Sequence, residues 1–254
     1  MQRRSIQRCA ALLRADRCGS FWPVEQVGPL RCHAADPFVR KQCMNNSPAF
    51  SHTPSKSPSD PAAWWRRTCW VADTRIALSG DLPVGPAAAA HLAGWVADGV
   101  TQVIDVRSEW DDQSLVAGLQ PQLDYCWAGA DDDGGAQPDE WFTAGVDAAL
   151  AALADPEAGL MVHCHMGVNR GPSMGFAIML ATGWMPVDAL KAIVAARPIA
   201  AVLYAENALS WWHRRNNVPE ALAMSQRNAV RAWLAHKQVD VSWVISRIRL
   251  AEAA

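Results

Sequence analysis

The sequence predicts an α/β fold with a central, mostly parallel sheet flanked by helices. After Trp64, short apolar runs with β-branched residues alternate with segments of helical periodicity, which is the pattern of such a sheet. Half of the 254 residues are hydrophobic and 19% are charged, an ordinary globular composition that argues against a wholly disordered chain. No apolar run approaches the roughly 18 residues that a membrane helix needs, so we expect no membrane span.

Individual elements follow from local signals. Gly99 ends an alanine-rich helical pattern, and Pro138 with two acidic residues after it is typical of a helix start. We expect strands at 101–107, 123–127 and 160–163, and helices at 87–98, 138–153, 174–182, 186–196, 202–215 and 219–236. The last residues, 241–254, fit either a short helix or a tail.

The chain changes character near residue 63. Residues 1–63 carry nine basic and four acidic side chains, a net charge of +5, whereas the rest has a net charge of -7. The first part shows no sustained periodicity and includes a Ser/Pro-rich stretch, features of a chain that buries too little to fold. We therefore predict a disordered basic extension and linker at 1–63, a catalytic domain at 64–236 and a terminal helix or tail at 237–254.

Cysteine usage and charge restrict location and partners. The seven cysteines are odd in number and match no disulfide framework, which predicts a reduced, cytoplasmic protein. The acidic domain has no basic stripe and no nucleic-acid-binding motif, so no nucleic-acid partner is expected. The oligomeric state is left open.

One segment, MVHCHMGVNRGPS at 161–173, carries the clearest chemistry. A strand delivers Cys164, a loop containing Gly167 follows, and a helix begins just after Arg170. Loop N–H groups and a helix N-terminus can hold a phosphate, and a guanidinium can grip two of its oxygens. The same positive field favours a thiolate, which is a nucleophile able to form a phosphocysteine. The expected phosphate-binding residues are His165, Met166, Gly167, Val168, Asn169 and Arg170.

A phosphocysteine route also needs an acid for the leaving group and later a base for water. Asp131, Asp132 and Asp133 follow the strand expected at 123–127, and a positioned acid is worth about 100- to 10,000-fold in rate. The residues alone leave open which of the three acts. Asp105 and Arg107 are more typical of a structural ion pair than of site residues. The Trp64-Trp65 and Trp211-Trp212 pairs are more typical of core packing than of substrate binding.

The loop resembles the signature of the cysteine-dependent protein tyrosine phosphatases, in particular compact dual-specificity phosphatases. Their His-Cys-x-x-Gly-x-x-Arg pattern falls on His163, Cys164, Gly167 and Arg170. The resemblance implies a protein tyrosine phosphatase-like fold, with Cys164 as nucleophile and Arg170 as the phosphate-holding residue. It also implies that His163 tunes the thiolate through hydrogen bonding, whereas the residue alone equally fits a core-facing histidine at a strand end.

Two further features bear on the resemblance. In the family a Trp-Phe pair follows the acid; Trp141 and Phe142 match that pair, which implies that Asp132 is the acid. The family usually has Ser or Thr directly after the arginine, where its hydroxyl helps the thiolate leave. This chain has Gly171, so we expect slower breakdown of the phosphocysteine.

The expected function is a phosphatase that hydrolyses phosphate monoesters without a metal or organic cofactor. Its expected partner is a phosphorylated protein or a small phosphomonoester. In a protein substrate the expected group is phosphotyrosine, and phosphoserine or phosphothreonine is left open as an alternative. Residues 165–169 include no lysine, which weighs against phosphoinositides. The alternatives are a phosphate-binding module without turnover, a phosphatase of small-molecule or lipid phosphates, and a rhodanese-like sulfurtransferase.

Overall fold

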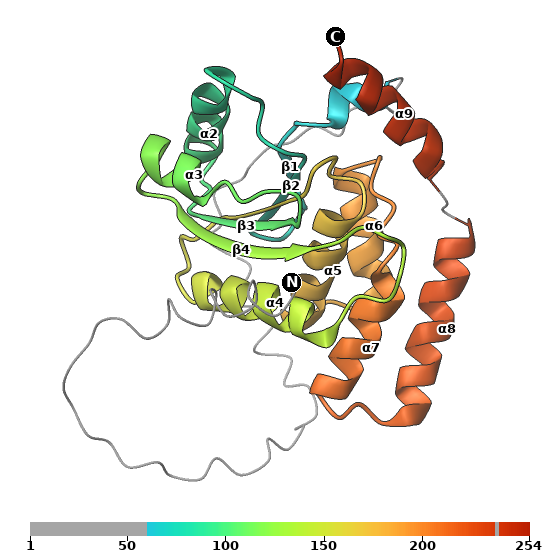
Figure 1. Cartoon of the computed structure of the whole chain (residues 1–254). Coiled ribbons are helices and arrows are strands. Elements are labelled where there is room, and N and C mark those ends of the chain that lie inside the picture. Colours follow the sequence, from blue (N-terminus) through green and yellow to red (C-terminus); the bar gives the residue numbers. More distant parts are fainter. Residues whose placement is uncertain (1–59, 237–238) are drawn as a thin grey trace, which may run out of the picture. The chain divides into compact units, whose positions relative to one another are not determined.

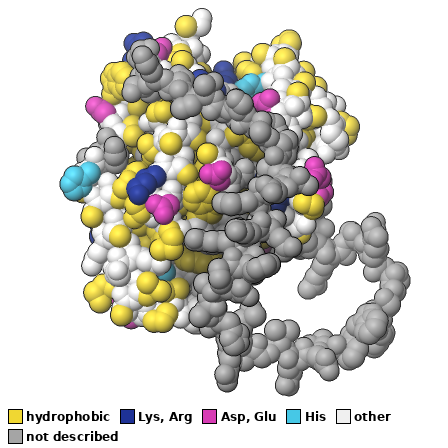
Figure 2. Space-filling view, turned by 180° about the vertical axis from the view of Figure 1, so that it is seen from behind, with side chains coloured by type: hydrophobic (Ala, Val, Ile, Leu, Met, Phe, Trp, Pro, Cys, Tyr) yellow, Lys and Arg dark blue, Asp and Glu magenta, His cyan; other side chains and the backbone are white. Residues whose placement is uncertain are grey.

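The computed structural model describes residues 60–236 and 239–254 (Figure 1). The disordered extension predicted for the first part of the chain therefore lies outside the described residues, except at its last four positions. Among the described residues, no helix is both long enough and apolar enough to cross a membrane. On the face drawn in Figure 2, basic and acidic side chains of the described residues are interspersed among apolar ones.

A five-stranded sheet lies at the centre, with strand order β1-β2-β5-β3-β4. The strands are β1 (Cys69–Trp70), β2 (Ile76–Ser79), β3 (Gln102–Arg107), β4 (Asp124–Ala130) and β5 (Leu160–His163). Only β1 runs antiparallel to its neighbour, so the predicted mostly parallel sheet is confirmed. β5 is the central strand and is buried along its whole length, as its continuous apolar run requires.

Helices cover both faces of the sheet (Figure 1). They are η4 (Pro61–Trp64, a 3-10 helix), α2 (Ala87–Ala97), α3 (Gln113–Leu119), α4 (Asp139–Leu153), α5 (Arg170–Ala181), α6 (Pro186–Ala196), α7 (Ala205–Arg215), α8 (Glu220–His236) and α9 (Val241–Glu252). α2 and α3 form one layer with the small core cluster around Trp95 and Met161, and α4 to α8 form the other with the main core. Alternate residues of the inner strands serve the two cores: Val103 and Met161 face one, Ile104 and Val162 the other.

Some elements were missed by the sequence patterns or start elsewhere. β1, β2 and α3 have two, four and seven residues, too few to show a period. α5 begins at Arg170, within a residue of the start expected just after Arg170, and the helical pattern from 174 is its continuation; a proline at position 172 fits the first turn. α7 begins at Ala205 rather than at 202, because Val202 has a positive φ of 50°, which a right-handed helix does not allow. The segment 241–254, for which the sequence fits either a short helix or a tail, forms the helix α9.

The tryptophan pairs lie in packed clusters. Trp64 and Trp65 are buried together with residues of α9, and Trp211 is buried in the main core beside Trp212. The structure thus agrees with the packing interpretation of both pairs.

Candidate active site

The predicted strand-loop-helix unit is present between β5 and α5. Cys164 directly follows the strand and is 2% exposed, and Arg170 is the first residue of the helix. The loop between them therefore lies at the carboxyl end of the central strand, the edge where open α/β sheets bind their ligands. A Cβ added at Gly171 would lie 3.5 Å from the Cys164 Sγ, so the first turn of α5 lies directly beside the thiol.

A buried arginine fixes the outer side of this loop. Arg197 is fully buried and donates to the carbonyl oxygens of Gly167 at 2.6 Å and Met166 at 3.3 Å. It also donates to the carbonyls of Trp65 and Arg67 in the segment after η4. Carbonyls held by Arg197 on the outside cannot turn toward Cys164, and this arrangement leaves the inner side to N–H groups.

Gly167 has to be a glycine here. Its φ is +63°, in the left-handed region, and an added Cβ would overlap the Arg197 guanidinium. The signature glycine thus allows the close approach between the loop and Arg197.

Arg170 is held in a fixed orientation but keeps one donor unused. Its Nη1 and Nη2 donate to the two carboxylate oxygens of Glu109 at 2.8 and 2.6 Å, and Nη1 also donates to the carbonyl of Ala130. Its buried Nε makes no hydrogen bond with any described residue and lies 3.4 Å from Asp132 Oδ2. Burial opposes the charge, but Glu109, Cys164 and Asp132 raise the pKa of Arg170 above its usual range, so the guanidinium stays charged.

Of the three acidic candidates, Asp132 is the one whose carboxylate reaches this arginine. Its Oδ1 accepts hydrogen bonds from Asn169 Nδ2 at 2.7 Å and from the Tyr204 hydroxyl at 2.8 Å, while Oδ2 faces Arg170. Asp133 instead accepts from the N–H of Gly135 two residues on, and Asp131 accepts from Gln137 Nε2 through its backbone carbonyl. The geometry therefore favours Asp132, and its role as the acid stays a prediction.

Asn169 and Tyr204 connect the two halves of the site. Asn169 Oδ1 accepts from the Ser173 hydroxyl at 3.2 Å and from the N–H of Leu203 at 2.8 Å, while its amide donates to Asp132. Burial and the neighbouring Asp132 raise the pKa of Tyr204, so its hydroxyl keeps its proton and acts as a donor. The Ser173 hydroxyl, the nearest one to Gly171 in sequence, is thus held by Asn169.

His163 lies in the core beneath the loop. Its ring packs 5.4 Å from Trp95, and its Nε2 is 3.7 Å from Asp105 Oδ2, beyond hydrogen-bond distance. Neither ring nitrogen makes a hydrogen bond with a described residue. Burial lowers the pKa of His163 to about 4 despite the opposing charge of Asp105, so the ring is neutral near pH 7. This placement agrees with the core-facing alternative, and tuning of the thiolate through a hydrogen bond from this ring finds no support in it.

Asp105 and Arg107 form the expected ion pair. Arg107 Nε and Nη2 donate to the two oxygens of Asp105 at 2.9 and 2.6 Å, and the Tyr125 hydroxyl donates to Asp105 at 2.7 Å. Arg107 also contacts Asp112. Burial on its own raises the pKa of Asp105, but His163, Arg107 and Tyr125 together lower it below its ordinary value. This buried network lies beside the end of β5, because Asp105 is paired in register with His163, the residue before Cys164.

The other loop side chains point away from the phosphate side. His165 contacts acidic residues on the outer side, while Met166 and Val168 join the apolar cluster around Trp64 and Trp65. Any phosphate binding by these three residues would therefore use their backbone N–H groups.

Three residues of this site were missed by sequence reasoning. Glu109 lies two residues after β3, at the same sheet edge as the loop, and that position was a usable signal. Arg197 and Tyr204 are about thirty residues from the loop in sequence and show no local pattern that links them to it.

No protein-family model matches the sequence, and no curated protein matches it. The structure is similar to solved dual-specificity phosphatases. The PTPMT1 crystal structure aligns with a TM-score of 0.47 and 21% identity over 61% of this chain and 99% of that one. Human DUSP28 aligns with a TM-score of 0.46 and 20% identity over 61% and 94%. A mouse putative dual specificity phosphatase complexed with zinc tungstate aligns with a TM-score of 0.47 and 18% identity over 68% of this chain and 96% of that one. At these identities the likeness concerns the fold alone.

Proposed function

We propose that this protein is a cysteine-dependent phosphatase that hydrolyses phosphate monoesters through a phosphocysteine intermediate. The observation that carries the proposal is the buried Nε of Arg170, which makes no hydrogen bond with a described residue and lies 3.4 Å from Asp132 Oδ2, in a side chain whose charge Cys164 also stabilises. A nucleophile, an anion-binding donor and a carboxylate therefore meet at one point, the arrangement that phosphoryl transfer to a thiol requires.

In the first step the Cys164 thiolate attacks phosphorus. A P–S bond forms and the bond from phosphorus to the leaving oxygen breaks, while a proton passes from Asp132 to that oxygen. Because Asn169 and Tyr204 both donate to Oδ1, the other oxygen of Asp132, Oδ2, is the one that carries the proton.

In the second step the Asp132 carboxylate takes a proton from water. The water oxygen attacks phosphorus, the P–S bond breaks, and inorganic phosphate and the thiolate are released. Asp132 thus returns to its protonated form for the next turnover.

Arg170 binds the phosphoryl oxygens in both steps. Glu109 holds its two terminal nitrogens, which orients the guanidinium plane in advance so that Nε and the loop N–H groups receive the phosphate. The side chain therefore needs no reorganisation when the substrate enters.

The substrate class we favour is a phosphorylated protein or a small phosphomonoester, because residues 165–169 offer no lysine for a second phosphate. A nucleophilic thiol works only where it stays reduced, so we also propose a cytoplasmic location. Cell fractionation that recovers the protein from an oxidising compartment would contradict that location.

Hydrolysis of an aryl phosphate by the wild-type chain and three variants tests the proposal. Cys164→Ser should abolish turnover, and Asp132→Asn should lower kcat by about 100- to 10,000-fold. The matched control Asp133→Asn should keep the wild-type rate, since that carboxylate bonds only locally. Phosphate binding without turnover in the wild type would instead favour the interaction module. Full activity of Asp132→Asn would show that Asp132 is not the acid, and a wild type that transfers sulfur but hydrolyses no aryl phosphate would favour sulfur-transfer chemistry.

A further inference from the structure

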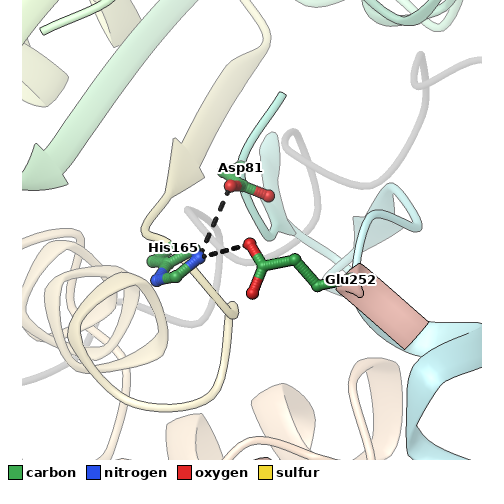
Figure 3. Close-up of side chains that lie close together, drawn as sticks. All are labelled: Asp81, His165 and Glu252. Atoms are coloured by element: carbon green, nitrogen blue, oxygen red, sulfur yellow. Dashed lines mark hydrogen bonds and ion pairs between the residues drawn. The ribbon is translucent and has the colours of Figure 1, made fainter. Parts of the chain in front are cut away.

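Three side chains with metal-ligand chemistry meet on the outer side of the loop (Figure 3). Asp81 follows β2, His165 follows the nucleophile, and Glu252 is the last residue of α9. The His165 Nε2 lies 3.1 Å from Glu252 Oε1 and 3.7 Å from Asp81 Oδ2. One ligand atom from each residue lies within 4.8 Å of the other two. Ligands at about 2.0–2.2 Å from a common Zn²⁺ have separations in this range.

The three side chains satisfy one another only in part, through the hydrogen bond between His165 Nε2 and Glu252 Oε1. Two carboxylates face a single ring nitrogen, which in a neutral histidine offers either one N–H or one lone pair. Arg66 pairs with the Oδ1 of Asp81 at 3.2 Å, which leaves Oδ2 directed toward His165. The Asp81 side chain is only 4% exposed. A cation at this point would compensate the buried carboxylate.

We propose that Asp81, His165 and Glu252 bind a divalent transition metal of the Zn²⁺ type. One imidazole and two carboxylates form a three-residue ligand set of the kind that zinc accepts, with water in the fourth position. The imidazole selects against Mg²⁺ and Ca²⁺, which prefer all-oxygen sites. The proposed metal is structural: its three ligands do not include Cys164, Arg170 or Asp132, which carry the phosphoryl transfer proposed above.

The site would join the catalytic loop to the C-terminal helix. Val244 and Ile248 of α9 are buried against Trp64, Trp65 and Val168, so the helix already packs on the outer side of the loop. Glu252 lies at the end of this helix, and its side chain reaches His165 only while α9 is docked. Metal binding and docking of α9 are therefore coupled, and each stabilises the other.

Zinc binding by the full-length chain tests this site. Protein stripped with a chelator is titrated with Zn²⁺ by calorimetry, and the bound metal is counted by atomic emission. Thiolates are also zinc ligands, so the test compares the zinc stoichiometry of variants that keep every cysteine. The wild type and the control Glu157→Gln, an exposed carboxylate outside this cluster, should bind one equivalent more than Glu252→Gln. Asp81→Asn should show the same loss.

Equal zinc stoichiometry and affinity in the wild type and Glu252→Gln would overturn the site. Glu252 is exposed, so this comparison holds even if the buried Asp81→Asn variant fails to fold. Cobalt substitution supplies a second criterion. The equivalent of Co²⁺ that is lost in Glu252→Gln should show no thiolate-to-cobalt charge-transfer band. If the bound Co²⁺ instead shows such a band, and only Cys164→Ser abolishes it, the metal is bound by the nucleophile and the proposal is rejected. Neither measurement depends on phosphatase activity.

Discussion

The inner and outer sides of the loop between β5 and α5 are built from opposite kinds of contact. On the inner side, Arg170 keeps a buried Nε without a hydrogen bond among the described residues. On the outer side, Arg197 is equally buried, but its guanidinium donates to four backbone carbonyls of the loop and the neighbouring segment. The comparison indicates that the outer contacts fix the loop, which allows the inner side to keep a donor free for a ligand.

The two arginines should therefore fail in different ways. Arg170 is oriented by a carboxylate at the site edge, so its loss should affect chemistry first. Arg197 is itself fully buried and donates to the buried carbonyls of Gly167 and Trp65, so its loss should affect stability first. Four substitutions follow from this division.

Replacing the inner arginine should have the largest effect on rate. Arg170→Lys keeps the charge beside Glu109 but removes the planar fork, and we expect kcat/KM for an aryl phosphate to fall about 1,000-fold, as for loss of a preorganised donor. Steady-state kinetics measures the effect, with circular dichroism to verify folding. A loss below tenfold would mean that the unused Nε is not the phosphate donor.

Replacing the outer arginine should have the largest effect on stability. Arg197→Met removes the donor shared by four carbonyls and leaves those of Gly167 and Met166 without it, whereas Trp65 still accepts from the N–H of Gly80 and Arg67 from Cys69. We expect the free energy of unfolding to fall by about 3–5 kcal/mol. Urea denaturation measures the change. The control Arg231→Met removes an exposed pair with Glu206 and should cost about 1 kcal/mol or less. Similar losses in both variants would refute the role assigned to Arg197.

The same division explains what the sequence could predict. Cys164, Gly167 and Arg170 lie within seven residues, so a strand, a tight loop and a helix start almost determine their geometry. Arg197 and Tyr204 reach the loop through the packing of α6 and α7, and no local pattern encodes that packing. Glu109 lies between these cases. Its place after a strand predicts that it lies at the right sheet edge, but does not predict that it pairs with Arg170.

The fold shows a similar boundary. Helices α4 and α8, with 15 and 17 residues, repeat their apolar pattern often enough to be recognised. β2 has only four residues, and its identity as a strand depends on pairing with β5, a long-range contact. Asp132 could be chosen among its neighbours only through the family resemblance, because the hydrogen bonds from Asn169 and Tyr204 come from distant segments.

The link between the two halves of the site should have a smaller effect. Tyr204→Phe removes one of two hydrogen bonds to Asp132 Oδ1 and keeps the buried ring. A hydrogen bond to a neutral or charged partner is worth about 1–2 kcal/mol, so kcat should fall by about 5- to 30-fold. An unchanged kcat together with a lower melting temperature would assign Tyr204 a structural role alone.

The smallest effect, and the one most specific to this chain, concerns Gly171. A Cβ at this position would lie 3.4–3.5 Å from the backbone and Sγ of Cys164, an ordinary contact, so a serine fits without displacing the loop. The Ser173 hydroxyl cannot replace the missing group, because Asn169 accepts its proton and the N–H of Tyr204 donates to it. Gly171→Ser should therefore place a hydroxyl beside the leaving thiolate and accelerate phosphocysteine breakdown by about tenfold, the value of one hydrogen bond. In rapid-quench experiments the wild type should show a burst and an accumulated intermediate, and the variant a smaller accumulation with faster turnover. A wild type without a burst would show that breakdown of the phosphocysteine is not its slow step. The control Gly171→Ala adds the Cβ without the hydroxyl, and so separates the chemical effect of the hydroxyl from stabilisation of the helix.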